Sequence, residues 1–547
     1  MAVPTQNDGE KASGTTAALL QAKGLTIQTR SGVSLLSDIS FHIEPGELVA
    51  LTGLSRSGKS TLLQSLAGLM APASGEILID GINLYTNLKA FRSIIGFVPA
   101  EFALQQNLTV AETLQDAARL RLPRSASSQE RKQRVLTLVG AVGLTQAIDR
   151  RVGLLSAVEK RKLSIAVELT GYPKLLLVDQ SADSLTPFEE VQITILMREL
   201  SRQGITIIQV NAQSRSAGVA DKVIFLAPGG QLAWFGPTDE AFAYLKSFIP
   251  RGVVKDLLGL QEALEILVNP QLRDGVEWAK RFKEHDAYEK YVDDPLHNRY
   301  PDLLMQTRPL LRIRLRTSSK EKLPPAIIPQ ASAFQKLLLL IRRNFRLLWR
   351  DKTGFLMLAI PPLIALVHFV LSSNTQLSPV VGDANRPPIV LGLLVFLVIL
   401  TAAFLVQNEI FKERAVYQRE SRTSSLLFPY ILSKVWLVAI LAIYQGLVWT
   451  VIHSLGEIGT GLAGGLQALL PTGIILTLLS FVGGILGLMV SALFRTELTT
   501  GWVLLLTVPL LLFISDPLSH WSKLAVIILF LMVLLAGIQY RAGSART

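Results

Sequence analysis

The sequence predicts two successive folds, an α/β domain followed by an all-α domain of membrane-spanning helices. The chain has 547 residues, which is too long for one compact domain. A glycine-rich loop near residue 53 lies between a strand-like and a helix-like segment, as in an α/β domain. Hydrophobic residues make up 50% of the chain, and long apolar runs dominate only the part from about residue 350 to 540. We therefore expect a water-soluble first domain and a membrane domain after it.

The glycine-rich loop fits the phosphate-binding pattern G-x-x-x-x-G-K-[ST]. The apolar run 47–51 before it reads as a strand, and residues 61–68 after it have helical spacing. A strand, a glycine turn and a helix start aim backbone N–H groups and the helix dipole at phosphates. Lys59 then reaches the outer phosphates, and Ser60 binds Mg²⁺. The expected nucleotide contacts are Gly53, Leu54, Ser55, Arg56, Ser57, Gly58, Lys59, Ser60 and Thr61. The alternative, a glycine- and serine-rich turn with a chance lysine, leaves the flanking strand and helix unexplained.

About six apolar runs in the second half are long enough to cross a bilayer as helices. They are residues 354–373, 387–406, 435–453, 467–492, 499–515 and 524–540. Any one of them could be a buried core helix, but consecutive runs separated by short polar loops indicate spans. Pro361 and Pro362 in the first run predict a kink.

The distribution of charge predicts the orientation in the membrane. Net charge is +12, and the basic residues cluster beside the apolar runs, so anionic lipid headgroups are better partners than nucleic acid. Residues 1–16 show no apolar core of a signal peptide, so we expect the first domain in the cytoplasm. Loops on that side and the tail carry Lys412, Arg414, Arg419, Arg422, Lys434, Arg495, Arg541 and Arg546, against Arg386 and Lys523 on the other. The positive-inside rule therefore predicts a multi-pass protein with both termini cytoplasmic. Cys is absent, which excludes a disulfide framework.

Residues 408–422, between the second and third runs, are amphipathic and densely charged. On this topology the segment is cytoplasmic, and a short helix there could dock on another domain and transmit motion. The alternative is a solvated charged loop.

Several local motifs are similar to those of one protein family. They are IGFVP at 95–99, NLTVAETL at 107–114, EKRK at 159–162, WFGP at 234–237, FKERAVYQRE at 411–420 and YILSK at 430–434. With the phosphate loop and the apolar runs, the chain resembles a half-transporter of the ATP-binding cassette (ABC) superfamily, of the ABCG (White) type. The resemblance implies a flexible N-terminus at 1–22, an ABC nucleotide-binding domain at 23–250, a connector at 251–331 and an ABC-2 type transmembrane domain at 332–547. It also implies ATP and Mg²⁺ as ligands and two nucleotide domains paired head to tail.

The family pattern places a metal-binding acid at Asp179, at the end of the strand-like run 174–179. The next residue in the family is a glutamate that activates the attacking water, but here it is Gln180. The switch histidine corresponds to Asn211, and the glutamine of the glutamine loop to Ala100. An amide can orient a water but cannot accept its proton, and loss of a general base typically lowers the rate about 10²–10⁴-fold. The resemblance therefore implies that no catalytic residue is intact.

The signature loop of the family reads Ser-Gly-Gly-Glu, and this chain has Ser156, Ala157, Val158 and Glu159 there. The resemblance implies that Ser156 and Glu159 meet the nucleotide of the partner chain, while the side chain of Val158 crowds an approach that glycine permits. Adenine in relatives stacks on an upstream aromatic residue, and residues 1–40 contain no Phe, Trp or Tyr. A missing stack corresponds to about 1–3 kcal/mol of binding.

Two hypotheses of different classes follow. In the first, the chain is a half-transporter that binds ATP and Mg²⁺, hydrolyses ATP weakly or not at all, and exports a hydrophobic or lipid-like substrate. It would act as a homodimer or as a heterodimer with a second ABC half-transporter. In the second, it is a non-transporting pseudo-ATPase, a membrane scaffold or regulatory subunit. The family resemblance favours the first and the motif losses favour the second. ATPase activity of the purified chain, alone and with candidate partner chains, distinguishes them.

Overall fold

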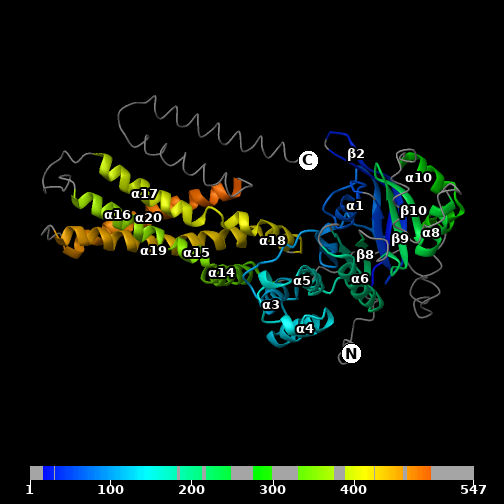
Figure 1. Cartoon of the computed structure of the whole chain (residues 1–547), viewed down its shortest axis with the longest axis horizontal. Coiled ribbons are helices and arrows are strands. Elements are labelled where there is room, and N and C mark those ends of the chain that lie inside the picture. The colour runs from blue at the N-terminus through cyan, green and yellow to red at the C-terminus, as the bar shows by residue number, and fades with distance from the viewer. Residues whose placement is uncertain are drawn as a thin grey trace, which may run out of the picture. The chain divides into compact units, whose positions relative to one another are not determined.

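The structure is a computed structural model that describes residues 17–29, 31–53, 55–180, 185–211, 217–247, 275–297, 331–374, 388–423, 426–459 and 465–493. The chain divides into two compact units that separate between Ala331 and Ser332. The first unit is α/β and the second is helical (Figure 1), which confirms the predicted fold class. The predicted domain boundaries stay predictions.

A six-stranded sheet of order β10–β9–β3–β8–β7–β6 forms the centre of the first unit. Its strands are β3 (Leu48–Gly53), β6 (Ile95–Val98), β7 (Leu175–Val178), β8 (Thr206–Val210), β9 (Lys222–Ala227) and β10 (Gln231–Pro237). All neighbours pair in parallel except β9 and β10. The strands β6, β7 and β8 are buried at every position, which fits the continuous apolar sequences of β6 and β7. Parallel pairing brings the carboxyl ends of β3, β6, β7 and β8 to one edge, where polar residues follow.

A second, antiparallel sheet of order β2–β1–β4–β5 shares the same core. Its strands are β1 (Leu20–Gln28), β2 (Ser34–Ile43), β4 (Ser74–Ile79) and β5 (Ile82–Asn83). Phe41 of β2 and Phe235 of β10 have ring centroids 5.8 Å apart. The two sheets are therefore held together by a common apolar interior.

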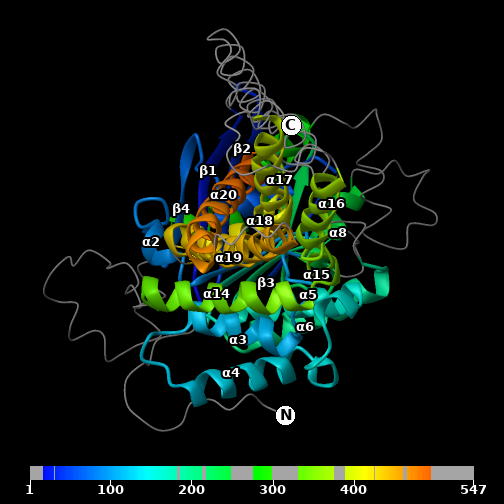
Figure 2. The same ribbon diagram turned by 90° about the vertical axis from the view of Figure 1, so that its left-hand side faces the viewer.

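Four helices of the first unit begin at polar caps that the sequence encodes locally. The helices of this unit are α1 (Lys59–Leu66), α2 (Leu88–Phe91), α3 (Val110–Arg121), α4 (Ser128–Ala141), α5 (Ala157–Leu169), α6 (Pro187–Arg202) and α8 (Thr238–Ser247), with the short 3₁₀ turns η1 (Thr145–Ala147) and η2 (Val152–Leu154). Capping boxes open α3, α4, α5 and α6, each with a Ser or Thr that accepts from the backbone of a Glu in the first turn. The helices α3, α4 and α5 pack on one another (Figures 1 and 2).

Part of the predicted connector packs on this core. Residues 275–297 form α10 (Gly275–Lys283), α11 (Asp286–Tyr288), the π-helical turn η5 (Glu289–Asp293) and α12 (Asp294–His297). Trp278 and Phe282 lie one turn apart on α10 and are both buried. The ring centroid of Phe282 is 5.4 Å from that of Trp234 in β10. This spacing puts one apolar stripe of α10 against the sheet.

The second unit consists of long helices that run alongside one another (Figure 1). They are α14 (Ala333–Arg350), α15 (Lys352–Met357), α16 (Ile360–Asn374), α17 (Pro388–Val406), α18 (Glu409–Thr423), α19 (Leu427–Gly459) and α20 (Gly465–Leu493). Among the described residues, three helical stretches are long and apolar enough to cross a membrane: Leu394–Thr423, Leu427–Ile452 and Leu470–Leu493. The amphipathic segment 408–422 lies in α18 from Glu409 onward, so it is helical and not a loop.

The second, third and fourth predicted spans overlap α17, α19 and α20, but the first differs from the structure. The run 354–373 is divided between α15 and α16, and its apolar helix Ile360–Val370 is shorter than the three candidate spans. Pro361 and Pro362 explain the break, because proline fits the first turn of a helix but not its interior. The predicted spans 499–515 and 524–540 lie outside the described residues.

Small residues allow the helices of the second unit to approach closely. A Cβ on Gly446 of α19 would come within 2.1 Å of the hydroxyl oxygen of Thr477 in α20. A Cβ on Gly483 of α20 would lie 2.5 Å from the carbonyl oxygen of Ile399 in α17. Helix contacts through glycine are typical of membrane bundles, where van der Waals packing drives association.

Candidate nucleotide site

The phosphate loop adopts a conformation that requires its glycines. Gly53 ends β3 with φ 145°, and Gly58 precedes α1 with φ 92°. A Cβ at Gly53 would lie 2.3 Å from the carbonyl oxygen of Leu226. Arg56 also has positive φ, 65°, a left-handed conformation that costs a non-glycine residue about 1–2 kcal/mol. The loop is therefore shaped for a close backbone approach, with Arg56 held in a strained conformation. Leu54 lies outside the described residues.

Lys59 begins α1 and lies across the loop. Its Nζ donates to the carbonyl oxygen of Gly53 over 2.8 Å. Burial lowers the pKa of Lys59, while the negative charge of Asp179 opposes that shift. The hydroxyl of Ser57 is buried in the same loop, with no hydrogen-bond partner among the described residues. A cation and an unsatisfied hydroxyl in a glycine cradle fit a phosphate group.

Ser60 and Asp179 come together although 119 residues separate them. The Ser60 hydroxyl donates to Oδ1 of Asp179 over 3.2 Å. Burial raises the pKa of Asp179, and the bond from Ser60 and the charges of Arg161 and Lys59 oppose the rise. Hydroxyl and carboxylate oxygens are the ligands that Mg²⁺ prefers, with nucleotide phosphates completing its shell. Among the described residues no cluster of three or more His, Cys, Asp or Glu could hold a metal by itself. The pair therefore fits a metal that arrives with a nucleotide.

The three positions that depart from the family pattern lie side by side on the edge of the sheet. Val98 pairs with Val178, and Val178 pairs with Gln209. Ala100, Gln180 and Asn211 each follow one of these partners by two positions, after Val98, Val178 and Gln209 respectively. The register thus brings the positions of the glutamine loop, the catalytic glutamate and the switch histidine into one row. The sequence motifs alone could not show this arrangement.

Gln180 is buried, with 4% of its surface exposed. Its Oε1 accepts no hydrogen bond from the part of the chain that the structure describes. An acceptor in that position can receive a hydrogen bond from a water molecule, which orients the water without taking its proton. Asp183, the next acid in the sequence, lies outside the described residues.

Asn211 is tied to helix α6 by two residues that the sequence motifs do not indicate. Its Nδ2 donates to Oε1 of Glu190 over 3.4 Å and to the hydroxyl of Thr194 over 3.3 Å. Its backbone N–H donates to Leu51 of β3 over 3.0 Å. Glu190 is 1% exposed, an unusual burial for a carboxylate. The only sequence signal for Glu190 and Thr194 is their spacing of four, which puts them on one face of α6.

Arg161 on α5 lies in the motif EKRK, but the motif does not show that this side chain is buried or what it contacts. It is completely buried and donates to the carbonyl oxygens of Pro99, Ala100 and Asp179. The backbone at Ala100 is therefore held in place, although its side chain offers no polar group.

Ser156 and Glu159 form the capping box at the start of α5. Glu159 N–H donates to the Ser156 hydroxyl over 3.2 Å, and the Ser156 N–H donates back to Glu159 over 2.8 Å. That bond from Ser156, followed by the nearby charge of Arg150, lowers the pKa of Glu159. Neither side chain has a hydrogen bond to the phosphate loop among the described residues. Their predicted contact with a partner's nucleotide stays a prediction.

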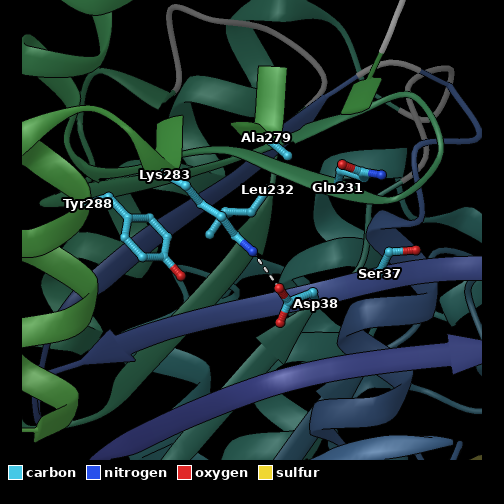
Figure 3. Close-up of a pocket in the computed structure, with 7 residues that line it drawn as sticks. All are labelled: Ser37, Asp38, Gln231, Leu232, Ala279, Lys283 and Tyr288. Atoms are coloured by element: carbon cyan, nitrogen blue, oxygen red, sulfur yellow. Dashed lines mark hydrogen bonds and ion pairs between the residues drawn. The ribbon is translucent and has the colours of Figure 1, made fainter. Parts of the chain in front are cut away.

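A separate surface pocket of about 190 Å³ lies between β2, β10 and α10. Its lining residues are Ser37, Asp38, Gln231, Leu232, Ala279, Lys283 and Tyr288 (Figure 3). Lys283 forms an ion pair with Asp38 across it, and the hydrogen bond to Asp38 raises the pKa of Lys283. None of the predicted nucleotide contacts lines this pocket.

Two family comparisons match the two halves of the chain. Residues 36–182 match the family described as ABC transporter, and residues 335–515 match the family described as ABC-2 type transporter. The first match contains the phosphate loop, Asp179 and Gln180, and the second begins within α14. The order is that of the predicted nucleotide and membrane domains.

Individual relatives agree with the resemblance. An ABC transporter ATP-binding/permease protein of Mycobacterium tuberculosis is 28% identical over 457 residues, which cover 80% of this chain and 47% of that protein. ABC transporter G family member 22 of Arabidopsis thaliana is 36% identical over 221 residues, 39% of this chain and 29% of the relative. The broad substrate specificity transporter ABCG2 of Rattus norvegicus is 32% identical over 233 residues, 41% and 35% of the two chains. This chain spans less than half the length of each.

Proposed function

We infer that this chain, which belongs to the ABC transporters and carries their ATP-binding and ABC-2 type membrane domains in that order, forms one half of a dimeric ATP-binding transporter. The observation that carries this proposal is the phosphate loop with its metal pair. Lys59 lies across the loop at 2.8 Å from Gly53, and Ser60 lies 3.2 Å from Asp179. This arrangement fits a Mg²⁺-nucleotide.

Hydrolysis by this chain alone should be weak or absent. Gln180 can orient a water but offers no base, and Asn211 is engaged with Glu190 and Thr194 on α6. Ala157 and Val158 both carry side chains that pack against the core of the first unit, where relatives have glycines. Binding of ATP and its hydrolysis are therefore separable properties of this site.

A head-to-tail pairing of two nucleotide domains would account for the distribution of these residues. Lys59, Ser60 and Asp179 lie at one end of the sheet, whereas Ser156 and Glu159 open a different helix and contact each other. A partner chain would supply the missing half of each site, as a second copy of this chain or as another ABC half-transporter. We further propose export of a hydrophobic or lipid-like substrate, as the resemblance to ABCG-type half-transporters implies.

We propose that the nucleotide domain and both termini are cytoplasmic and that lipids contact α14. One stripe of α14 is exposed along its length: Phe334, Leu338, Arg342, Phe345 and Trp349. The opposite face is buried and contacts α19. Aromatic and leucine side chains interrupted by an arginine suit the boundary between acyl chains and anionic headgroups.

Nucleotide binding by the full chain in lipid nanodiscs tests the proposal. A fluorescent ATP analogue with Mg²⁺ should bind the wild type, and Lys59→Ala should abolish binding. Lys132→Ala, which removes an exposed lysine on α4, is the matched control and should bind as the wild type does. Equal binding by the wild type and Lys59→Ala would contradict a functional phosphate loop.

Phosphate release with and without candidate partner half-transporters separates transport from a regulatory role. Activity that appears only with a competent partner supports a transporter half. Nucleotide binding with no activity in any pairing would instead favour the pseudo-ATPase hypothesis.

A further inference from the structure

One buried arginine joins three elements at the nucleotide edge of the sheet. Arg161 lies in α5, and its exposed fraction is 0%. Its Nη1 donates to the carbonyl oxygens of Pro99 over 2.7 Å and of Asp179 over 3.1 Å. Its Nη2 donates to the carbonyl oxygen of Ala100 over 2.8 Å. The guanidinium lies 5.0 Å from the ring centroid of Phe102.

The cost of burying this charge makes the three bonds strong constraints. Burial lowers the pKa of Arg161 to about 10, and the nearby Asp179 opposes the shift. Arg161 therefore remains a cation at neutral pH. Nε of Arg161 is buried with no hydrogen-bond partner among the described residues, so Nη1 and Nη2 carry all of its bonds. A displacement of the three carbonyls would therefore leave the buried charge without compensation. Carbonyl oxygens at the ends of β6 and β7 are thereby held in one arrangement.

The position of Arg161 in the sequence gives this arrangement a function. It follows Ser156, the first residue of the signature segment, by five positions on the same helix. The carbonyl of Asp179 belongs to the residue whose carboxylate meets Ser60, and Gln180 comes next. At Ala100 the family's glutamine side chain is absent, so the backbone carbonyl is the group through which that loop is held.

We propose that Arg161 is a positioning residue that holds the metal-binding end of β7 and the loop at Ala100 against the helix that begins with the signature segment. This inference rests on the proposed role of Asp179 in binding Mg²⁺ with a nucleotide. Arg161 does not touch the nucleotide; it acts through the placement of Asp179. Residues that orient metal ligands in this way typically contribute about 10–100-fold to metal affinity.

The test is a Mg²⁺ titration of nucleotide binding by the full chain in nanodiscs. A fluorescent ATP analogue is bound first in EDTA and then with increasing Mg²⁺. Arg161→Met should raise the Mg²⁺ concentration for half-maximal enhancement about 10–100-fold and leave affinity in EDTA unchanged. The half-maximal Mg²⁺ concentration of Arg161→Lys should lie between those of the wild type and Arg161→Met, because a lysine keeps the charge but not the planar guanidinium.

Arg121 is the matched control for loss of a buried arginine. It lies in the same unit, is 9% exposed, and donates to Glu168 over 2.7 and 2.8 Å. Arg121→Met leaves Glu168 buried without its cation, so it should lower the melting temperature at least as much as Arg161→Met. Its Mg²⁺ titration should match that of the wild type. The proposal is overturned if Arg161→Met keeps the wild-type titration, or if Arg121→Met shifts it equally.

Hydrogen exchange decides the question if the wild type binds no nucleotide, a result that would refute the proposed function by itself. Arg161→Met should then speed amide exchange in residues 175–180 relative to Arg121→Met. Unchanged exchange there would show that Arg161 positions nothing and would overturn the inference.

Discussion

Replacement of Gln180 by glutamate restores a carboxylate next to Asp179, yet we expect this single change to give little ATPase activity. A general base is worth about 10²–10⁴ in rate, or about 2.7–5.4 kcal/mol at about 1.36 kcal/mol per tenfold. That gain requires a water held against the γ-phosphate. In this structure Asn211, at the switch position, donates hydrogen bonds to Glu190 over 3.4 Å and to Thr194 over 3.3 Å, both on α6. We therefore expect a gain of less than about tenfold, because contacts that act together are strongly non-additive.

The environment of Gln180 also opposes the new carboxylate. The side chain is 4% exposed, and burial already raises the pKa of the neighbouring Asp179. A second carboxylate beside it should also have a raised pKa, because like charges and burial both disfavour ionisation. The combined variant Gln180→Glu, Asn211→His, Ala157→Gly and Val158→Gly should gain about 10²–10⁴-fold. In that variant Glu190 would lie within reach of the new histidine and hold it.

The assay is phosphate release by the full chain in nanodiscs at saturating Mg²⁺-ATP. Each variant is also made with Lys59→Ala, which should abolish any gain that arises in this site. Each of the two glycines introduced in the first turn of α5 costs about 1 kcal/mol of helix propensity. The melting temperature of every variant is therefore measured together with its rate of phosphate release. A gain of about 100-fold from Gln180→Glu alone would refute the reasoning, since the switch and signature positions would then not limit the rate. Brisk wild-type hydrolysis would mean that another acid, such as Glu190 or Glu101, supplies the base.

Gly58→Ala should lower the melting temperature and abolish nucleotide binding, because its Cβ would lie 2.6 Å from Cδ2 of Leu36 and 2.9 Å from the carbonyl oxygen of Leu35. A Cβ at Gly140 in α4 would meet no atom within 4 Å, so Gly140→Ala should raise the free energy of unfolding by up to about 1 kcal/mol. Equal melting temperatures for these two variants would contradict the strain at Gly58. Trp278→Ala should lower the free energy of unfolding of the first unit by about 3–5 kcal/mol in a denaturant titration, whereas Phe188→Ala, 73% exposed, should change it little. A small effect at Trp278 would show that α10 is not part of the core. A single cysteine at Ala415, which is exposed on α18, should react with a membrane-impermeant reagent from the cytoplasmic side, and one at position 380 from the other side. The reverse labelling would overturn the proposed orientation.

The phosphate loop could be predicted from sequence because its geometry is local. Two glycines five positions apart, a lysine and a following serine specify the turn, and the flanking strand and helix are contiguous with it. The capping box of Ser156 and Glu159 is similarly local, since its two hydrogen bonds join residues three apart. The apolar helices α17, α19 and α20 were also predictable, because length and hydropathy decide whether a helix can cross a membrane.

Contacts between distant segments could not be predicted in the same way. The pairing of Ser60 with Asp179 depends on strand order, and so does the row of Ala100, Gln180 and Asn211. The sequence also presents Arg161 and Glu190 as ordinary charged residues on amphipathic helices. Only packing decides that they are buried at the nucleotide edge, and burial converts an ordinary charge into a constraint on every group it bonds.

The remaining differences have the same physical origin. The mixed-charge sequence of the connector 251–331 does not show that Trp278 and Phe282 enter the core, because a stripe at helical spacing does not identify its partner surface. Hydropathy likewise predicts residues 354–373 as one continuous apolar span. In the structure a new helix begins within this span, with Pro361 and Pro362 in the first turn of α16. The sequence by itself determined which side chains are available to bind a phosphate and which segments are apolar enough to cross a bilayer. The tertiary structure decided which of them meet, because register and burial are properties of the whole fold.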